Sequence, residues 1–437
     1  MHYNENITYE ELIDKLHINN NSDREILDKA YSYALKCYEG KVRLTGDDLI
    51  THSLNTAYIL ANLNVDITTI VAALIHDVIN LCNKTPDEIE ELFGSDVRII
   101  VESLSKINKL ELTSDEEEKA IYLRKVMVGL SEDVRVLYIK LACRLHNMRT
   151  NWAIKPLNQK KKAMETESVL IPIAHRLGIN SIKSELENLC LYYTKPDVYN
   201  DILEKLNKSR DELNSNLENM KKELSNLLKE NGINFEIKGR VKSVYSIYKK
   251  LATGRKWSDI YDILALRIFV EKESDCYLVI GLVHSKFRPV PKRFKDYIAN
   301  PKGNMYQSLH TSVFGDNGDL YEIQVRTYEM DEIAEKGLAS HWSYKEKGTK
   351  KVQAMMEQKL ELFRNIIESN SNENDLTFEN NIKSDILDDL IYVFTPKGDV
   401  VELPKGSTPL DFAYRIHSRV GDTCVGAIVN EQIVPLN

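Results

Sequence analysis

Hydrophobic residues in the first part of the chain recur at intervals of three and four positions, which is the spacing of an amphipathic helix. Ile59 and Leu63, for example, lie one helical turn apart. Pro86 begins a further helix whose first turn carries carboxylates, and Gly94 ends it. The pattern predicts an almost wholly helical domain over residues 1–195.

A long charged segment follows this domain, from Val198 to about Lys229. Its leucines keep a helical spacing among Lys and Glu residues, so it predicts one continuous helix. A coiled-coil tail is the simpler interpretation. A single helix of this kind more often bridges two domains, and we expect that role here.

The pattern changes after Asn231 and Gly232, where short apolar runs begin to alternate with helical segments. Such alternation predicts a mixed α/β domain. We expect strands at 235–238, 263–270, 309–314 and 320–327, and helices at 241–251 and 276–287. The turn sequence Asp316-Asn317-Gly318 predicts that the last two strands form a hairpin.

The last of these strands has one charged face. Because side chains alternate along a strand, Glu322, Gln324 and Arg326 share a face, while Ile323 and Val325 take the other. A charged strand face is ordinarily solvated. If it instead faces a cluster of cations, it would form the wall of a catalytic site.

The remainder of the chain predicts a polar helix at 345–368, a linker, and a small module that begins at Leu390. The module has two strands around a turn at 396–399, then a helix and a further strand. A small β-grasp sheet needs at least one more strand, so we expect the chain to stop within this module. The predicted parts are 1–195, 196–345 with the leading bridging helix, a helical linker at 346–386, and the partial module at 387–437.

Composition restricts the class of protein. A chain of 437 residues holds two to four domains, and its net charge of −8 argues against a general nucleic-acid coat. The six cysteines are scattered without a C-x-x-C pair, which disfavours a disulfide framework and a zinc knuckle. No signal peptide and no apolar run of about 18 residues is present, so we expect a cytoplasmic protein without a membrane partner.

Two basic blocks interrupt this acidic chain. Residues 238–257 hold seven Lys or Arg and no carboxylate, and residues 284–303 hold six against one Asp. Two isolated acids, Asp262 and Glu322, accompany them. Two cationic clusters and two separate carboxylates suit a site for two polyphosphates and a divalent metal, which predicts nucleotide chemistry.

Five motifs in this region, taken together, resemble the long RelA/SpoT homologues, which make and degrade (p)ppGpp. They are GRVKSVYSIYKK, YDILALR, RFKDYIANPKGNMYQSLHT, EIQVRT and AEKGLASHWSYK, and they stand in the family's order. The resemblance implies a multidomain protein with an all-α HD-type domain, an α/β nucleotidyltransferase-like synthetase domain and a partial β-grasp TGS domain. The implied synthetase transfers pyrophosphate from ATP to the 3′-hydroxyl of GDP or GTP.

The chemistry of that transfer requires a metal on the phosphates and a carboxylate near the attacking hydroxyl. Asp262 and Glu322 are the expected Mg²⁺ ligands, with Glu322 closest to the role of base and Arg240 a third catalytic residue. The resemblance assigns ATP to Arg240, Lys242, Ser246, Lys250 and Arg267. It assigns GDP or GTP to Lys295, Lys302, Asn304, Tyr306, His310 and Gln324, with Tyr306 stacked on the base.

Residues 40–178 resemble the family's HD-type hydrolase, which uses Mn²⁺ to remove the 3′-pyrophosphate. The matching positions are Arg43, His52, His76, Asp77 and Asn147. Three positions, in two places, depart from the family. Cys143 stands where the family has Asp, and Asn80-Leu81 replaces a Glu-Asp pair.

Because Mn²⁺ prefers oxygen ligands, we expect no Mn²⁺ at this degenerate site and no hydrolysis. A zinc site that uses Cys143 is an alternative, although a single buried Cys is ordinarily a small core residue. The domain would then bind ppGpp as a regulator or simply restrain the synthetase.

The leading hypothesis is therefore a (p)ppGpp synthetase with an inactive hydrolase domain. A bifunctional synthetase/hydrolase remains open, and the basic sequence Arg293 to Asp296 is of the form associated with bifunctional members. A non-enzymatic RNA-binding regulator is the third reading. The TGS resemblance implies that the full-length protein contacts the ribosome and uncharged tRNA, with His417 near the tRNA 3′ end.

Overall fold

The chain forms two compact units, Met1–Glu361 and Leu362–Asn437. The computed structural model describes residues 7–18, 20–108, 121, 123, 126, 133–208, 210–257, 264–302, 304–315, 318–337, 390–395, 400–404, 406–429 and 432–436. Asp262, the helix expected at 345–368 and the linker expected at 346–386 lie outside these residues.

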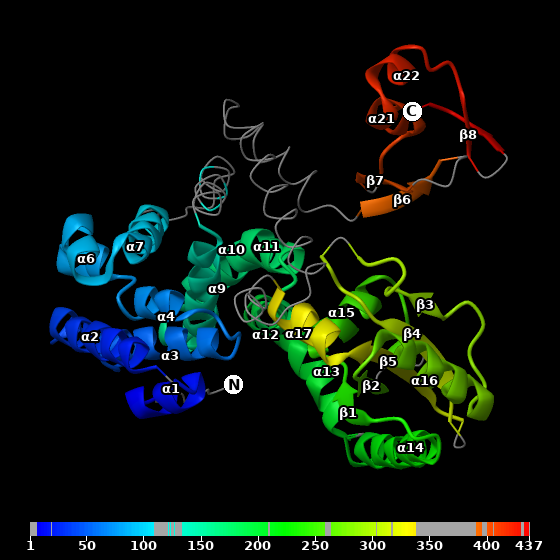
Figure 1. Cartoon of the computed structure of the whole chain (residues 1–437), viewed down its shortest axis with the longest axis horizontal. Helices are drawn as coiled ribbons and strands as arrows, with labels where there is room; N and C mark the ends of the chain where they lie inside the picture. The colour runs from blue at the N-terminus through cyan, green and yellow to red at the C-terminus, as the bar shows by residue number, and fades with distance from the viewer. Residues whose placement is uncertain are drawn as a thin grey trace. The chain divides into compact units, whose positions relative to one another are not determined.

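The first unit begins with an all-α domain, as predicted (Figure 1). Its described helices are α1 Tyr9–Leu16, α2 Asn21–Tyr38, α3 Leu49–Ala61, α4 Ile67–Leu74, α5 Val78–Cys82, α6 Pro86–Phe93, α7 Ser95–Asn108, α9 Val134–Arg149, α10 Pro156–Glu165, α11 Ile171–Arg176 and α12 Asn180–Thr194, with short 3-10 and π turns at Asn151–Ala153 and Thr166–Leu170. The expected helix that begins at Pro86 is confirmed: the Thr85 side chain caps its first turn and Gly94 follows its last residue.

Helices α3, α4 and α9 pack together at the centre of this domain. Both α3 and α9 bury polar residues along with apolar ones, among them His52 on α3 and Cys143 and His146 on α9. Buried polar groups need partners to offset their desolvation, so this concentration marks a site rather than ordinary core.

The prediction of one continuous helix over residues 198–229 is wrong. The structure has two helices, α13 Pro196–Lys208 and α14 Arg210–Glu230. Tyr199 and Ile202 of α13 pack with α15 (Val244–Ala252), whereas Leu224 and Leu228 of α14 pack on the sheet of the α/β domain. The apolar stripe therefore serves two different packing partners, which one straight helix does not reach.

The α/β domain contains a five-stranded sheet in the order β1-β2-β5-β4-β3. The strands are β1 Phe235–Val241, β2 Leu264–Val270, β3 Lys295–Asp296, β4 Leu309–Phe314 and β5 Leu320–Thr327. Only β2 and β5 are parallel; β4 and β5 form the expected antiparallel hairpin. Two further helices complete the domain, α16 Glu273–Lys286 and α17 Tyr328–Lys336.

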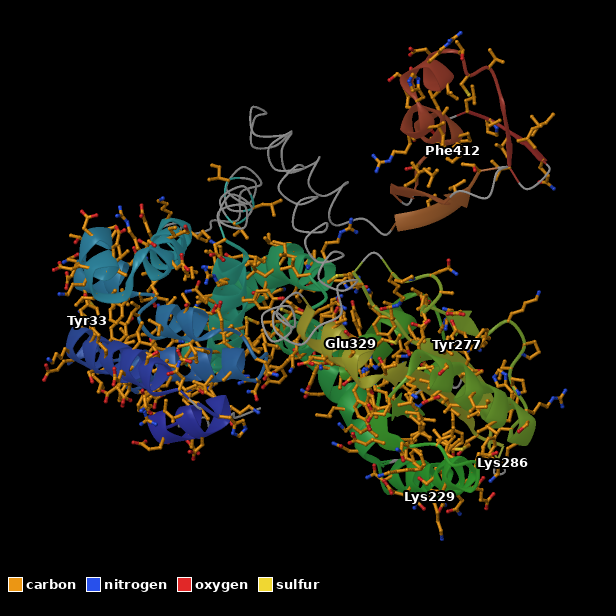
Figure 2. The ribbon with its side chains drawn as sticks, in the orientation of Figure 1. Tyr33, Lys229, Tyr277, Lys286, Glu329 and Phe412 are labelled. Atoms are coloured by element: carbon orange, nitrogen blue, oxygen red, sulfur yellow. The ribbon has the colours of Figure 1, made fainter. Side chains whose placement is uncertain are left out.

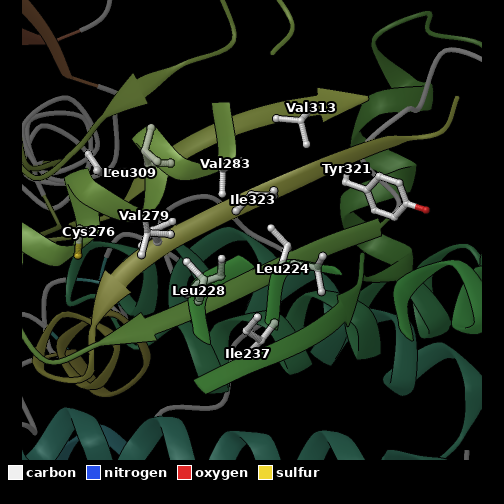
Figure 3. Close-up of a cluster of buried hydrophobic side chains, with 14 of the residues drawn as sticks. Leu224, Leu228, Ile237, Cys276, Val279, Val283, Leu309, Val313, Tyr321 and Ile323 are labelled. Atoms are coloured by element: carbon white, nitrogen blue, oxygen red, sulfur yellow. The ribbon is translucent and has the colours of Figure 1, made fainter. Parts of the chain in front are cut away.

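One face of the sheet is apolar and is covered by α14 and α16. Figure 3 shows Ile323 and Ile237 of the sheet with Leu224 of α14 and Val279 of α16 in one buried cluster. Figure 2 shows Lys229 and Lys286 in the last turns of these two helices, where a cation complements the helix dipole. The opposite face of the sheet is left for polar side chains.

Helix α17 joins the two domains of the first unit. Its last carbonyl groups have no partner within the helix, and side chains of the all-α domain donate to them. Asn180 Nδ2 donates to Ala334 O at 2.6 Å, and Ser181 Oγ donates to Glu335 O at 2.9 Å. Tyr138 Oη donates to Lys336 O at 3.1 Å.

The second unit has two described pairs of antiparallel strands and two short helices. They are β6 Leu390–Phe394, β7 Val400–Pro404, α21 Pro409–Ile416, α22 Ser418–Asp422, β8 Ala427–Val429 and β9 Gln432–Val434. The expected helix after the first strand pair is divided at His417, whose extended backbone ends α21. The expected turn at 396–399 lies outside the described residues. No described helix in either unit is long and apolar enough to cross a bilayer.

Candidate functional site

The polar face of the five-stranded sheet carries two rows of aligned side chains. Strand register pairs Lys238 with Arg267, Arg267 with Gln324, Gln324 with His310, and His310 with Lys295. A second row runs through Arg240, Ala265, Glu322 and Ser312. Since directly paired residues project from the same face, the structure brings six predicted site residues onto one surface: Arg240, Arg267, Lys295, His310, Glu322 and Gln324.

Glu322 is the centre of a hydrogen-bonded chain on this surface. His310 Nδ1 lies 3.2 Å from Glu322 Oε1, and Gln324 Nε2 donates to the same oxygen at 3.0 Å. Tyr306 Oη lies 2.8 Å from His310 Nε2. Burial lowers the pKa of His310, so a neutral ring that accepts from Tyr306 and donates to Glu322 accounts for both of its contacts.

The charge state of Glu322 follows from these contacts. Burial alone would raise the pKa of its carboxyl, but the hydrogen bonds from His310 and Gln324, with the nearby Lys242, lower the pKa to about 2. Glu322 is thus an ionised carboxylate in a site lined by cations.

A group of aromatic rings lies beside His310. The rings of Tyr297 and Tyr306 each meet the His310 ring edge-on, at centroid distances of 5.2 and 5.6 Å. Lys302 Nζ lies 4.4 Å from the Tyr297 ring centroid and 5.1 Å from that of Tyr306. Tyr297 was not among the predicted residues. Its place in the basic block, one residue after β3, was the available signal.

Two arginines, the half-buried Arg267 and the fully buried Arg326, lie on the polar face and pair with carboxylates of α17. Arg267 Nη1 lies 2.8 Å from Glu335 Oε1, and Arg326 Nη2 lies 2.6 Å from Asp331 Oδ1. The Arg326 side chain is fully buried, with its guanidinium 5.7 Å from the Tyr306 ring centroid. Arg326 therefore anchors α17 to β5 and packs against the ring of Tyr306.

Several predicted nucleotide ligands already have local partners. Ser246 Oγ lies 2.8 Å from Ser243 Oγ in the first turn of α15. Asn304 Oδ1 accepts from Tyr306 N, and its amide lies 3.5 Å from His175 O of the all-α domain. Lys250 lies in the last turn of α15, and Lys242 directly precedes Ser243, the N-cap of that helix.

A second candidate site is a cavity of about 330 Å³ in the all-α domain. It brings together the predicted Arg43, His52, Asp77, Asn80, Cys143 and Asn147. Three lining cations were not predicted: Lys140, Arg144 and Lys162. Lys140, Cys143 and Asn147 share one face of α9 by helical spacing, which was a usable signal, whereas nothing local distinguishes Lys162 from its neighbours in a run of three lysines.

Two histidines, His52 and His146, link Arg43 to the wall of this cavity. Arg43 Nη1 lies 3.2 Å from His146 Nδ1, and His52 Nδ1 lies 2.7 Å from the same atom. A guanidinium only donates, so His146 Nδ1 is an acceptor and His52 Nδ1 carries the hydrogen. Burial lowers the pKa of His146 to about 3, which agrees with a neutral acceptor ring.

The three residues expected to depart from the family's hydrolase carry no carboxylate. Cys143 Sγ lies 3.2 Å from His52 Nε2 and accepts from Asn147 Nδ2 at 3.6 Å. The Asn80 side chain is turned to Ser105, whose hydroxyl donates to Asn80 Oδ1 at 2.7 Å. Leu81 is apolar. Asp77 is the only carboxylate among the lining residues that the structure describes, so this donor set does not fit Mn²⁺.

His417, predicted to lie near tRNA, is exposed at the junction of α21 and α22. Its Nδ1 accepts a hydrogen bond from Arg419 N at 3.1 Å and caps the second helix. Arg415 and Arg419 are exposed beside it.

Comparison with known proteins finds three matching regions. Residues 239–349 match the region found in RelA/SpoT proteins, residues 30–180 match an HD domain, and residues 391–437 match a TGS domain. The all-α domain, the α/β domain and the carboxyl-terminal module thus correspond to the expected fold classes.

Similar curated proteins cover nearly the whole chain. A GTP pyrophosphokinase of Myxococcus xanthus is 43% identical over 419 residues, which are 95% of this chain and 55% of that protein. A guanosine-3′,5′-bis(diphosphate) 3′-pyrophosphohydrolase of Aquifex aeolicus is 42% identical over 99% of this chain and 61% of its own length. The bifunctional (p)ppGpp synthase/hydrolase SpoT of Escherichia coli is 42% identical over 94% of this chain and 59% of its own length. The chain therefore spans little more than half of these relatives.

Among solved structures, small alarmone synthetase 2 of Bacillus subtilis is 28% identical over 37% of this chain and 94% of its own, with a TM-score of 0.27.

Proposed function

Because this chain belongs to the RelA/SpoT family, we propose that it is a (p)ppGpp synthetase, which transfers the pyrophosphate of ATP to the 3′-hydroxyl of GDP or GTP. The observation that carries the proposal is the polar face of the sheet. An ionised Glu322 lies there between cations on two sides, in register with Arg240 and beside His310 and Gln324. We expect this reaction in the cytoplasm.

The two basic blocks supply the two nucleotide sites. Arg240, Lys242 and Arg267 lie on or next to β1 and β2 and would hold the ATP phosphates, whose charge shifts toward the leaving AMP. On the other side of Glu322, Lys295 and Lys302 accompany the aromatic group. Tyr297 and Tyr306 offer the flat surfaces on which a guanine base stacks.

Mg²⁺ fits this site because Glu322 is an ionised oxygen donor. We expect Glu322 and Asp262 to hold the ion. Its charge would neutralise the phosphates of the bound nucleotides. The low pKa of Glu322 also bears on its second expected role. A carboxylate with a pKa of about 2 is a weak proton acceptor near neutral pH, so it orients the hydroxyl more effectively than it deprotonates it.

The synthetase proposal is tested with labelled ATP and either GDP or GTP in Mg²⁺. We expect a 3′-pyrophosphorylated product from the full chain, and at least a 100-fold lower rate for Glu322→Gln. Glu218→Gln, on the exposed side of α14, is the matched control and keeps the wild-type rate. Absence of product from the folded wild-type chain would refute the proposal.

For the all-α domain we propose loss of Mn²⁺-dependent hydrolysis. The support is the chemistry of the cavity, where a thiol takes the place of a carboxylate and Asn80 is held by Ser105. The cations Arg43, Lys140, Arg144 and Lys162 suit a polyphosphate, so the domain would still bind (p)ppGpp as a regulatory ligand.

A bifunctional enzyme is the second candidate, favoured by the relatives named as hydrolases and by the retention of His52, His76 and Asp77. Incubation with ppGpp and Mn²⁺ separates the two. No pyrophosphate release is expected from the wild type, whereas turnover by the wild type that Asp77→Asn abolishes would establish the bifunctional reading.

For the carboxyl-terminal module we propose contact with uncharged tRNA and, in a longer protein, with the ribosome. The exposed His417, Arg415 and Arg419 at one helix junction support an RNA contact. Filter binding of labelled uncharged tRNA tests it: His417→Ala is expected to weaken binding, and unchanged affinity would refute the role of His417.

A further inference from the structure

Soft ligand atoms converge at one buried point in the all-α domain. His52, His76 and Cys143 come from α3, from the turn after α4, and from α9, and their side-chain donors lie within 4.8 Å of one another. His52 is 4% exposed and His76 is 1% exposed. Burial of three such groups at one point is costly unless something binds them together.

Each histidine presents an unprotonated nitrogen to the same place. His76 Nδ1 lies 2.7 Å from Ala73 O, a contact that requires a hydrogen on Nδ1 and leaves Nε2 with its lone pair. His76 Nε2 is buried and makes no hydrogen bond of acceptable geometry among the described residues, although Asp77 Oδ2 lies nearby. The contact of His52 Nδ1 with His146 likewise places the hydrogen of the His52 ring on Nδ1. His52 Nε2 therefore has a free lone pair, and it faces Cys143 Sγ.

The spacing of these atoms suits a tetrahedral ion. Bonds of about 2.1 Å to nitrogen and about 2.3 Å to sulfur place the two ligand atoms roughly 3.6 Å apart. The observed separation of His52 Nε2 and Cys143 Sγ is 3.2 Å. Asp77 Oδ2 lies 3.2 Å from His76 Nε2, but it is not among the ligand atoms that all lie within 4.8 Å of one another. The protein therefore brings three ligand atoms together at this point.

We propose that the all-α domain binds one Zn²⁺ ion through His52, His76 and Cys143. Two imidazoles and a thiolate are ligand types that zinc takes in proteins, whereas a hard Mn²⁺ ion does not favour the thiolate. The inference goes beyond the proposed synthesis of (p)ppGpp, which uses none of these residues.

The surrounding contacts are those of a second ligand shell. The backbone carbonyl of Ala73 and the ring of His146 hold the two ligating histidines in the required tautomers. The Asn147 amide donates to Cys143 Sγ at 3.6 Å and stabilises a thiolate. The thiolate and the Asp77 carboxylate together offset the charge of the ion, despite the cations on the cavity wall.

Three protein ligands hold the zinc and leave its fourth tetrahedral position to a small ligand such as water. The ion would tie α3 and α9 to the α4–α5 turn. This role predicts that zinc stabilises the domain.

The first measurement is the metal content of the untagged full chain. Purification without chelator is expected to give close to one zinc per chain by inductively coupled plasma mass spectrometry, with little manganese. After removal of zinc, Co²⁺ is expected to give a thiolate-to-cobalt charge-transfer band and the intense visible bands of a tetrahedral site. A chain that binds neither ion refutes the proposal.

Matched variants identify the ligands. Cys143→Ala is expected to lose the charge-transfer band and most bound zinc, while Cys190→Ala, which removes another buried thiol on α12, keeps both. Cys143→Asp replaces sulfur by oxygen and is expected to shift the preference from Zn²⁺ toward Mn²⁺. Retention of the charge-transfer band by Cys143→Ala would overturn the assignment, and circular dichroism establishes that each variant is folded.

Chelation gives an independent readout that needs no variant. If zinc binds only the folded domain, its removal lowers the melting temperature of the wild type, and added Zn²⁺ restores it. An unchanged melting temperature in a chain shown to have lost zinc would contradict the structural role.

Discussion

At the scale of single residues, the ionised Glu322 links stability to pH. Its folded pKa of about 2 lies below the ordinary 4.5, so its contribution is complete above pH 4.5 and is lost as pH falls toward 2. We expect Glu322→Gln to lower the free energy of unfolding at pH 7 by about 3 kcal/mol. Urea denaturation at pH 7 and pH 3 checks this, because the difference from wild type should shrink at the lower pH.

The aromatic pair beside His310 makes a second prediction about single residues. Tyr297→Ala and Tyr306→Ala are each expected to raise KM for GDP about tenfold or more and to leave KM for ATP nearly unchanged, since stacking on one base is worth about 1–3 kcal/mol. Tyr306→Phe keeps the ring but loses the hydroxyl contact with His310 Nε2. It should retain most of the GDP affinity; an equal loss in Phe and Ala variants would instead assign the effect to the hydrogen bond.

Local periodicity alone predicts the position of some residues of the site. The alternation of β5 was enough to place Glu322 and Gln324 on one face. Tyr297 was missed because its contacts with Tyr306 and His310 are made across a loop and a strand pair. The tautomer of His52 follows from the contacts that Arg43 and His52 make with His146, which lies more than 90 positions later in the chain. No local pattern contains that information.

At the scale of elements, the end of α17 depends on one glycine. Gly337 has a φ of 61°, and a Cβ there would overlap the carbonyl oxygen of Leu177. Gly337→Ala is therefore expected to destabilise the first unit by about 2 kcal/mol or more. Gly281→Ala on α16, where a Cβ meets nothing within 4 Å, is the matched control and should be neutral or slightly stabilising. Thermal unfolding of both variants, compared with wild type, makes the measurement.

The observed helices and strands differ from the predicted ones where tertiary packing, and not local propensity, determines the bounds of an element. The stripe of apolar residues from Tyr199 to Leu228 is periodic enough for one helix, yet its two halves bury against different clusters. The strand β3 has only two residues, so it carries no periodicity and exists through its pairing with His310 and Leu309. Strands β4 and β5 matched their predicted bounds because alternation and a turn sequence agreed.

At the scale of the whole molecule, α17 contacts both domains of the first unit. Its side chains Asp331 and Glu335 hold Arg326 and Arg267 at the proposed catalytic face. Its backbone carbonyls accept hydrogen bonds from Asn180 and Ser181 of α12. The same short helix is thus fixed by both domains, so a change in the packing of α12 bears on the arginines of the catalytic face.

This arrangement predicts that the two domains unfold together. Replacing Asn180 and Ser181 by Ala leaves the carbonyls of Ala334 and Glu335 without these donors, at a combined cost of about 2 kcal/mol. We expect scanning calorimetry to show one transition for these domains in the wild type and two in the double variant. Ser225→Ala, which removes a side-chain hydrogen bond within α14 alone, should keep the single transition. Equal melting profiles for the double variant and this control would mean that the carbonyl contacts of α17 do not couple the domains.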